Sequence, residues 1–193
     1  MIFTKTLNSI FKPFGLFFKH YQNSGLKIAL IWAFSRVFTK LTGVPIISQC
    51  KVTDQVFVGS QFGAKGLDKL NRNGITNILN LRKEFDDTVF DLSGNNYCYL
   101  PVIDDTAPTE DELQKGVEFI QNSIHENGKV YVHCAAGVGR SVTIVAAWLI
   151  KEHNLSVEES LNKIRINRPF ILPVSEQFTL LRKWETKFNH YHE

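Results

Sequence analysis

The sequence predicts an α/β fold in which a mostly parallel central sheet is flanked by helices on both faces. The first observation is that short β-branched runs alternate with helix-like segments from residue 46 onwards, which is the pattern of a parallel sheet with crossover helices. The second is length, because 193 residues suit one domain with an extension. The third is a shift in composition near residue 46, which predicts an N-terminal amphipathic helical extension.

The alternating segments define the elements of the predicted domain. Strands are expected at residues 52–58, 75–81, 97–103 and 129–132. The first of these reads as one or two short strands around a turn at Asp54, ended by Gly59. Helices are expected at residues 67–73, 110–125, 142–153, 157–167 and 174–188, with Thr109 and Ser156 as N-caps. Residues 82–96 are polar, and we expect them to be irregular with at most one helical turn.

The N-terminal residues differ in charge from the rest of the chain. Residues 1–53 hold seven of the 22 Lys and Arg residues and none of the 19 Asp and Glu residues. They also hold seven of the fifteen Phe residues. Gly43 and Pro45 mark a boundary. We therefore expect a basic, Phe-rich extension at residues 1–45 and a compact domain at residues 46–193.

Helical spacing in the extension predicts two amphipathic segments. Pro13 and Gly15 interrupt the first segment, which favours a kinked pair of turns over a continuous helix. The second segment runs over residues 26–41. Neither holds the roughly 20 consecutive apolar residues that a membrane span needs. The apolar stripes consist of Leu7, Phe11, Phe14 and Phe18 in the first segment and of Leu26, Leu30, Phe34, Val37 and Leu41 in the second.

Three interpretations of residues 1–41 remain open. In the first, the segment lies on an anionic membrane surface, with each lysine contributing on the order of 1 kcal/mol. In the second, the helix at residues 26–41 packs on the domain as part of an ordinary core. In the third, the segment is a cleaved targeting sequence, since acid-poor basic amphipathic segments also direct proteins to organelles.

Residues 129–141 predict a strand, an anion-binding loop and a helix N-terminus in succession. Small loop residues let successive backbone N–H groups turn inward around a phosphate, and glycines permit the positive φ that such a loop requires. The helix N-terminus adds a positive end, and Arg140 can hold two phosphate oxygens at once. The residues expected to bind phosphate are Ala135, Ala136, Gly137, Val138, Gly139 and Arg140.

The same positive environment acts on Cys134. It lowers the pKa of the thiol, so that the thiolate is available to attack phosphorus. We expect His133 to orient the loop by hydrogen bonding. The Ser141 hydroxyl is expected to support the sulfur as it leaves the phosphorylated intermediate.

The sequence His-Cys, five residues and Arg-Ser resembles the active-site loop of the cysteine-dependent protein tyrosine phosphatase superfamily. The small domain and the residues around the loop resemble its dual-specificity branch. This resemblance covers about residues 50–188 and leaves the extension unexplained. It implies a dual-specificity phosphatase-like fold, a phosphocysteine intermediate, and no metal or other cofactor.

The resemblance also implies an aspartate that protonates the leaving oxygen and later activates water. The matching loop is residues 103–109. Asp104 matches best, on its distance from Pro108, and Asp105 is the alternative. A purely solvated role for both acids is the other interpretation.

Substrate class is the least determined property. Phosphotyrosine, phosphoserine and phosphothreonine in proteins rank first, because the loop holds no basic residue besides Arg140. A simple phospholipid phosphomonoester is the alternative, since the extension would bring the domain to a membrane. A catalytically idle phosphate-binding module and a sulfur-transfer or arsenate-reducing domain rank lower, because the cysteine, the Arg-Ser pair and the upstream acids fit a phosphatase better.

Cysteine content bears on the compartment. The three cysteines are odd in number and far apart, which predicts free thiols and a reducing, cytoplasmic setting. A peripheral membrane position follows if the extension is an anchor. No nucleic-acid partner is expected.

Overall fold

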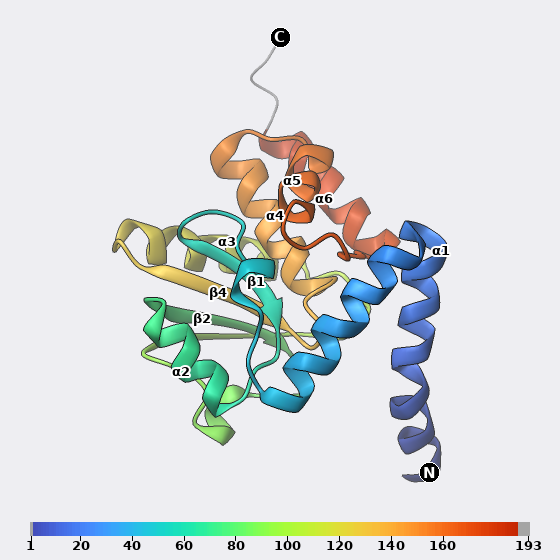
Figure 1. Cartoon of the computed structure of the whole chain (residues 1–193). Helices are drawn as coiled ribbons and strands as arrows, with labels where there is room; N and C mark the ends of the chain where they lie inside the picture. Colours follow the sequence, from blue (N-terminus) through green and yellow to red (C-terminus); the bar gives the residue numbers. More distant parts are fainter. Residues whose placement is uncertain (1, 189–193) are drawn as a thin grey trace.

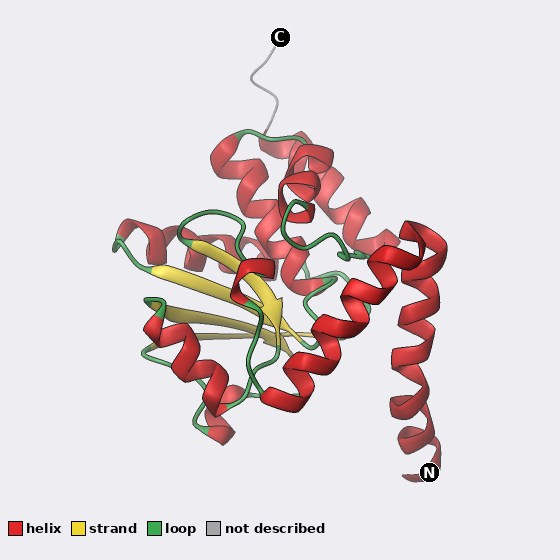
Figure 2. Ribbon diagram, viewed as in Figure 1, coloured by secondary structure: helices red, strands yellow, loops and turns green. Residues whose placement is uncertain are grey.

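A four-stranded sheet forms the centre of the molecule (Figures 1 and 2). The computed structural model describes the backbone of residues 2–188 and the side chains of residues 15–188. The strand order is β1-β4-β2-β3, with β1 at Val56–Ser60, β2 at Ile75–Arg82, β3 at Asn96–Val102 and β4 at Lys129–Cys134. All three strand pairings are parallel, which confirms the predicted sheet. β4 lies between β1 and β2, so its carboxyl end is flanked by two other carboxyl ends.

Helices cover both faces of the sheet, as predicted (Figure 2). One core cluster joins the sheet to α3 (Glu110–His125), α4 (Arg140–His153), α5 (Val157–Arg165) and α6 (Ser175–Phe188). A second cluster, on the other face, includes Leu70 of α2 (Ala64–Arg72) and Tyr131 of β4. Successive strand residues point to opposite faces, so Val130 and Val132 belong to the first cluster and Tyr131 to the second.

Local capping signals predicted several helix ends correctly. The bounds of α3 are those expected, and Thr109 forms a capping box with Glu112. Ser156 forms the equivalent box with Glu159 at the start of α5. α2 begins earlier than expected, at Ala64, and α5 ends two residues before the expected position. Two short 3-10 helices, Ile47–Gln49 and Asp87–Phe90, complete the fold, and the second is the single turn expected within residues 82–96.

The first strand differs from its prediction. Only an isolated antiparallel bridge, Lys51 to Phe57, precedes β1, and β1 continues through Gly59 instead of ending there. The reason is packing: a Cβ at Gly59 would lie 1.9 Å from the hydroxyl oxygen of Tyr131. Gly59 therefore makes room for a buried aromatic ring within the sheet and does not terminate the strand.

The extension forms α1 (Ile2–Thr42), and its break lies at a different glycine from the one expected. The helix continues through Pro13 and Gly15, and the predicted kink there is wrong. Non-helical geometry occurs at Gly25, where φ is +81° and ψ is 170°. Glycine adopts positive φ without a steric penalty. The chain turns back at this point, so the two helical arms form a V that diverges away from the bend (Figure 1).

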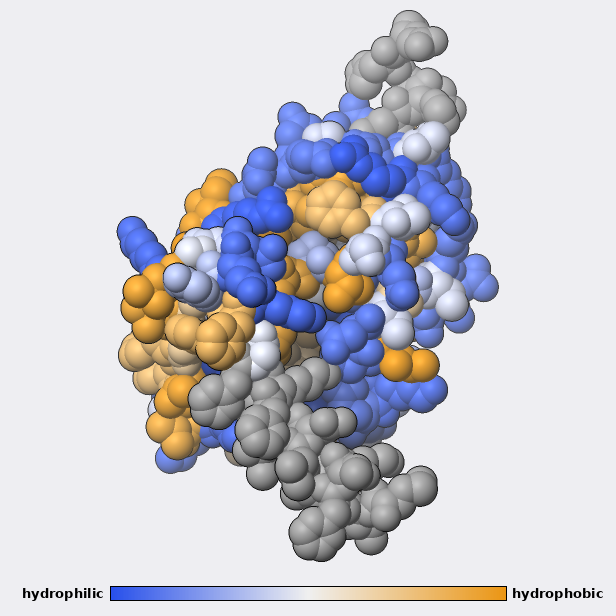
Figure 3. Space-filling model, turned by 90° about the vertical axis from the view of Figure 1, so that its right-hand side faces the viewer, coloured by the Kyte–Doolittle hydropathy of each residue, from blue (hydrophilic) through white to orange (hydrophobic). Residues whose placement is uncertain are grey.

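The second arm of α1, residues 26–42, packs on the domain through its less apolar face. Ala29, Trp32, Ser35 and Thr39 are all buried. The predicted apolar stripe instead faces solvent: Leu26, Leu30, Phe34, Val37 and Leu41 are between 54% and 81% exposed. Figure 3 shows hydrophobic residues gathered toward one edge of this side of the molecule. Among the described helices, none combines the length and apolar character that crossing a membrane requires.

Candidate active site

The loop at residues 134–140 lies at the carboxyl edge of the sheet, where parallel sheets bind ligands. β4 ends at Cys134 and α4 begins at Arg140. Asp104 and Asp105 follow β3 and line the same cavity as Cys134. The cavity has a volume of about 800 Å³. The structure therefore gathers the predicted nucleophile, the predicted arginine and both candidate acids at one site.

Cys134 is almost fully buried, at 3% exposure. Its Sγ accepts a hydrogen bond from the backbone N–H of Gly137 at 3.3 Å and lies 3.4 Å from the Ser141 Oγ. Burial alone disfavours the thiolate. The positive charge of Arg140 and the hydrogen bonds from Ser141 and Gly137 outweigh it, so the pKa of the Cys134 thiol is lowered. This environment therefore favours the thiolate, the form of the sulfur that attacks electrophiles.

The loop backbone is held from outside. Gly137 has a φ of +69°, and a Cβ there would lie 2.4 Å from the backbone of Gly59. Arg168 donates from Nε to the Gly137 carbonyl at 2.6 Å and from Nη2 to the Ala136 carbonyl at 3.0 Å. Sequence reasoning missed Arg168. It follows α5 and lies 31 residues after Gly137 in the sequence, so only the folded structure brings it to the loop.

Arg140 lies at the base of the site with 2% exposure. Its Nη1 donates to the carbonyls of Leu81 and Val102 at 3.2 and 2.9 Å, at the ends of β2 and β3. The Glu84 carboxylate accepts from both terminal nitrogens at 3.0 Å. Burial raises the pKa of Glu84, but hydrogen bonds from Arg140 and Arg82 outweigh this and lower it to about 2. Sequence reasoning missed Glu84, although its position just after a strand neighbouring β4 was a usable signal.

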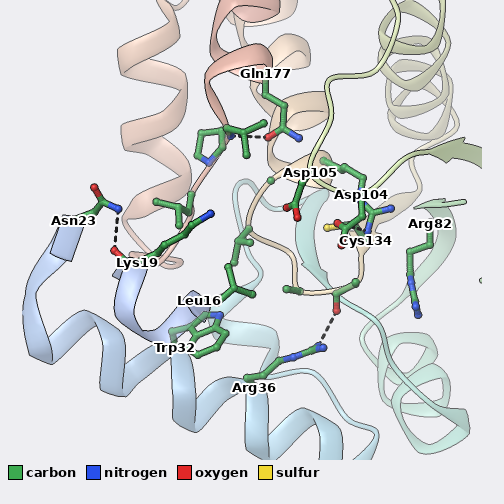
Figure 4. Close-up of a pocket in the computed structure, with 18 of the residues that line it drawn as sticks. Leu16, Lys19, Asn23, Trp32, Arg36, Arg82, Asp104, Asp105, Cys134 and Gln177 are labelled. Carbon is green, nitrogen blue, oxygen red and sulfur yellow. Dashed lines mark hydrogen bonds and ion pairs between the residues drawn. The ribbon is translucent and has the colours of Figure 1, made fainter. Parts of the chain in front are cut away.

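The two candidate acids differ in their contacts. An Asp104 oxygen lies 2.9 Å from Nη2 of Arg140, and the Asp104 side chain is 40% exposed. Asp105 has a φ of +60°, an uncommon conformation for a residue other than glycine. Figure 4 shows both carboxylates near Cys134. The ion pair with Arg140 places the Asp104 carboxylate beside the buried guanidinium.

The buried ring of His133 is bonded to Asp87, which the sequence did not identify as a site residue. Its Nε2 lies 2.8 Å from Oδ2 of Asp87, and both side chains are fully buried. Asp87 also accepts from the Gln61 amide at 2.9 Å. This bond ties the end of β4 to the 3-10 helix at Asp87–Phe90. Asp87 therefore holds the His133 ring in place, and any effect of His133 on the orientation of the loop depends on this bond.

The extension forms one wall of the cavity. Leu16, Lys19, Trp32 and Arg36 of α1 line it together with the loop residues (Figure 4). Arg36 donates from Nη1 to the carbonyl oxygen of Ala135 at 2.8 Å. Composition indicated a separate role for the extension, and no pattern in the sequence indicated that it reaches the site.

Comparison with known proteins agrees with this arrangement. A profile of the family described as "Dual specificity phosphatase, catalytic domain" matches residues 56–187. Human dual specificity protein phosphatase 26 is 33% identical over 131 residues, which is 63% of this chain and 62% of that protein. Phosphatidylglycerophosphate phosphatase PTPMT1 of Arabidopsis thaliana is 26% identical over 147 residues, or 74% of this chain and 42% of that protein. The chain thus spans less than two thirds of the length of these relatives.

Solved structures show the same fold. The structure of PTPMT1 in complex with PI(5)P has a TM-score of 0.66 at 26% identity and covers 72% of this chain and 94% of that one. The structure of DUSP15 has a TM-score of 0.61 at 26% identity and covers 74% and 96%. Fold and loop together define a domain of the cysteine-dependent phosphatases. Because the profile spans more than half of the sequence, the chain belongs to the dual specificity phosphatase family.

Proposed function

We propose that the chain hydrolyses phosphomonoesters through a phosphocysteine intermediate at Cys134. The observation that carries the proposal is the environment of the sulfur: a buried thiol with a lowered pKa, bonded to a loop N–H and a hydroxyl, above the Arg140 guanidinium. A substrate phosphate in the loop would receive hydrogen bonds from residues 135–139 and from Arg140. It would compete with Asp104 and Glu84 for that guanidinium.

The proposed reaction has two steps. In the first, Cys134 Sγ bonds to phosphorus as the ester P–O bond breaks, and the leaving oxygen takes a proton from Asp104. Displacement of Asp104 from Arg140 by the phosphate would free the carboxylate to take up a proton from solvent and then act as the acid. In the second, water attacks phosphorus and gives a proton to Asp104. The S–P bond breaks, and the Ser141 hydroxyl donates to the departing thiolate.

An aryl phosphate assay tests these roles. The wild-type chain should release inorganic phosphate, and Cys134→Ser should abolish turnover. Asp104→Ala should lower kcat about 100-fold or more, while Asp105→Ala should have a smaller effect. The reverse order would assign the acid to Asp105. Absence of wild-type turnover would favour an idle phosphate-binding module, and retained activity in Cys134→Ser would refute the phosphocysteine.

Phosphorylated proteins are the proposed substrates. The loop holds no basic residue except Arg140, which suits a single phosphate better than a highly charged headgroup. The human relative is named a dual specificity protein phosphatase. The second candidate is a simple phospholipid phosphomonoester. It is favoured by the relative named phosphatidylglycerophosphate phosphatase and by the exposed apolar stripe of α1. Parallel assays on phosphopeptides and on vesicle-borne phospholipid monoesters decide between them by kcat/KM.

We also propose that residues 1–45 form an extension that holds the catalytic domain, residues 46–193, against an anionic membrane in the cytoplasm. The support is the solvent-facing stripe together with the absence of acidic residues before Asp54. Phe34→Gln combined with Leu41→Gln should abolish flotation with anionic vesicles. The matched control replaces Val89 and Ile166, which are 72% and 77% exposed elsewhere, with Gln. Equal flotation of both double variants would refute the anchor.

A further inference from the structure

Donors outside the loop hold a row of its carbonyl oxygens. Arg36 bonds the Ala135 oxygen at 2.8 Å, and the same oxygen accepts a longer bond from the Gln61 N–H at 3.4 Å. Arg168 bonds the oxygens of Ala136 and Gly137. The backbone N–H of Leu172 donates to the Val138 oxygen at 2.8 Å. Four consecutive carbonyls are therefore fixed by groups that belong to other parts of the chain.

A hydrogen bond that fixes the direction of a carbonyl group also fixes the direction of the N–H group in the same peptide unit. A peptide unit is planar, and its C=O and the following N–H point in opposite directions. A bond to the Ala135 oxygen therefore sets the direction of the Ala136 N–H, and a bond to the Ala136 oxygen sets that of Gly137. The second of these N–H groups already points at the Cys134 sulfur, at 3.3 Å. The external donors thus keep the N–H groups directed at the site that the phosphate would occupy.

Arg36 is the one of these donors that lies outside the family domain, residues 56–187. Its helix position is set by packing: Trp32, one turn earlier, is 3% exposed, and Ser35 and Thr39 are buried beside it. In Figure 4 the Arg36 side chain runs from α1 toward the loop and ends at the carbonyl.

We propose that Arg36 is a positioning residue of the phosphate-binding loop, so that the extension is part of the catalytic apparatus. This inference rests on the proposed phosphatase function. Arg36 orients the Ala136 N–H of the loop by holding the Ala135 carbonyl, while Arg168 orients the N–H groups of Gly137 and Val138. Through this contact α1 has an indirect role in oxyanion binding, in addition to any contact with a membrane.

Three variants of the full chain test the proposal. Arg36→Met removes the donor and keeps the length of the side chain. Arg36→Lys restores one charged donor. Arg72→Met makes the same exchange at an exposed helical position in α2 and serves as the control. The measurements are tungstate affinity by calorimetry, and kcat and KM on an aryl phosphate. Tungstate binding needs no turnover, so it reports on the loop even if the proposed function fails.

Arg36→Met is expected to weaken tungstate binding and lower kcat/KM about ten-fold each, the effect of losing one charge-assisted hydrogen bond. Arg36→Lys should recover most of both losses, and Arg72→Met should match wild type. Values for Arg36→Met within about two-fold of wild type would overturn the proposal. If Arg36→Met does not fold, as judged by near-UV circular dichroism, Arg36→Ala decides: a weakening of tungstate binding of about ten-fold supports the role, and affinity within about two-fold of wild type overturns it.

Discussion

Acidification should separate the two arms of α1, because His20 is buried where they meet. His20 of the first arm is 0% exposed, and its ring centroid lies 4.9 Å from that of Trp32 in the second arm. Neither ring nitrogen has a hydrogen-bond partner within the described residues. Burial lowers the pKa of His20 from 6.5 to about 4. The packed arms therefore hold a neutral imidazole at neutral pH.

The direction of the pH effect on the packing of the two arms follows from proton linkage. Separated arms expose His20, which then takes up a proton below about pH 6.5, whereas the packed arms do not until about pH 4. The stabilisation is complete above pH 6.5 and is lost as the pH falls. Between pH 7 and pH 5 the loss is about 2 kcal/mol, and it reaches about 3 kcal/mol near pH 4.

Amide hydrogen exchange measures this opening. Peptides covering residues 26–42 should exchange faster at pH 5 than at pH 7 after correction for intrinsic rates, because exchange reports local opening. His20→Leu removes the titrating group from a fully buried site and should abolish the difference. Peptides from α3 are the internal reference. An equal pH response in wild type and His20→Leu would refute the reasoning.

Three further substitutions test the packing. Asp87→Ala leaves the His133 ring unpaired in a fully buried site, and we expect a loss of about 3 kcal/mol in urea unfolding together with reduced turnover; an unchanged midpoint would contradict this. Gly59→Ala would place a methyl group 1.9 Å from the Tyr131 hydroxyl and should cost about 2 kcal/mol. Gly15→Ala has open space within 4 Å and should stabilise α1 by up to about 1 kcal/mol. Equal melting temperatures for Gly59→Ala and Gly15→Ala would contradict the packing argument.

Features with local causes were predictable from the sequence. α3 has the expected bounds because its N-cap and capping-box glutamate lie within four residues of each other. The loop between Cys134 and Arg140 was predictable because strand, small residues and helix follow one another directly. The parallel sheet followed from alternation of elements.

Features that depend on long-range packing were not predictable. Glu84, Asp87 and Arg168 reach the site from segments that are far from the loop in sequence, and their side chains carry no local signal of that destination. The break in α1 illustrates the same limit. Pro13 and Gly25 both permit a break, but reversal occurs at Gly25, where the second arm can return and pack on the domain.

Helical periodicity identified the stripe of α1 correctly and still did not say which face is buried. An apolar stripe normally faces the core, but here Leu30 and Phe34 face solvent while Trp32 and Arg36 face the domain. Because the stripe is exposed, several large side chains do not contribute the roughly 1.5–3 kcal/mol of stabilisation that burying each of them would provide. Rotating the helix to bury them would withdraw Arg36 from the Ala135 carbonyl. The observed orientation therefore leaves an apolar surface available to a partner and keeps the loop contact, which links the two roles proposed for the extension in a single helix.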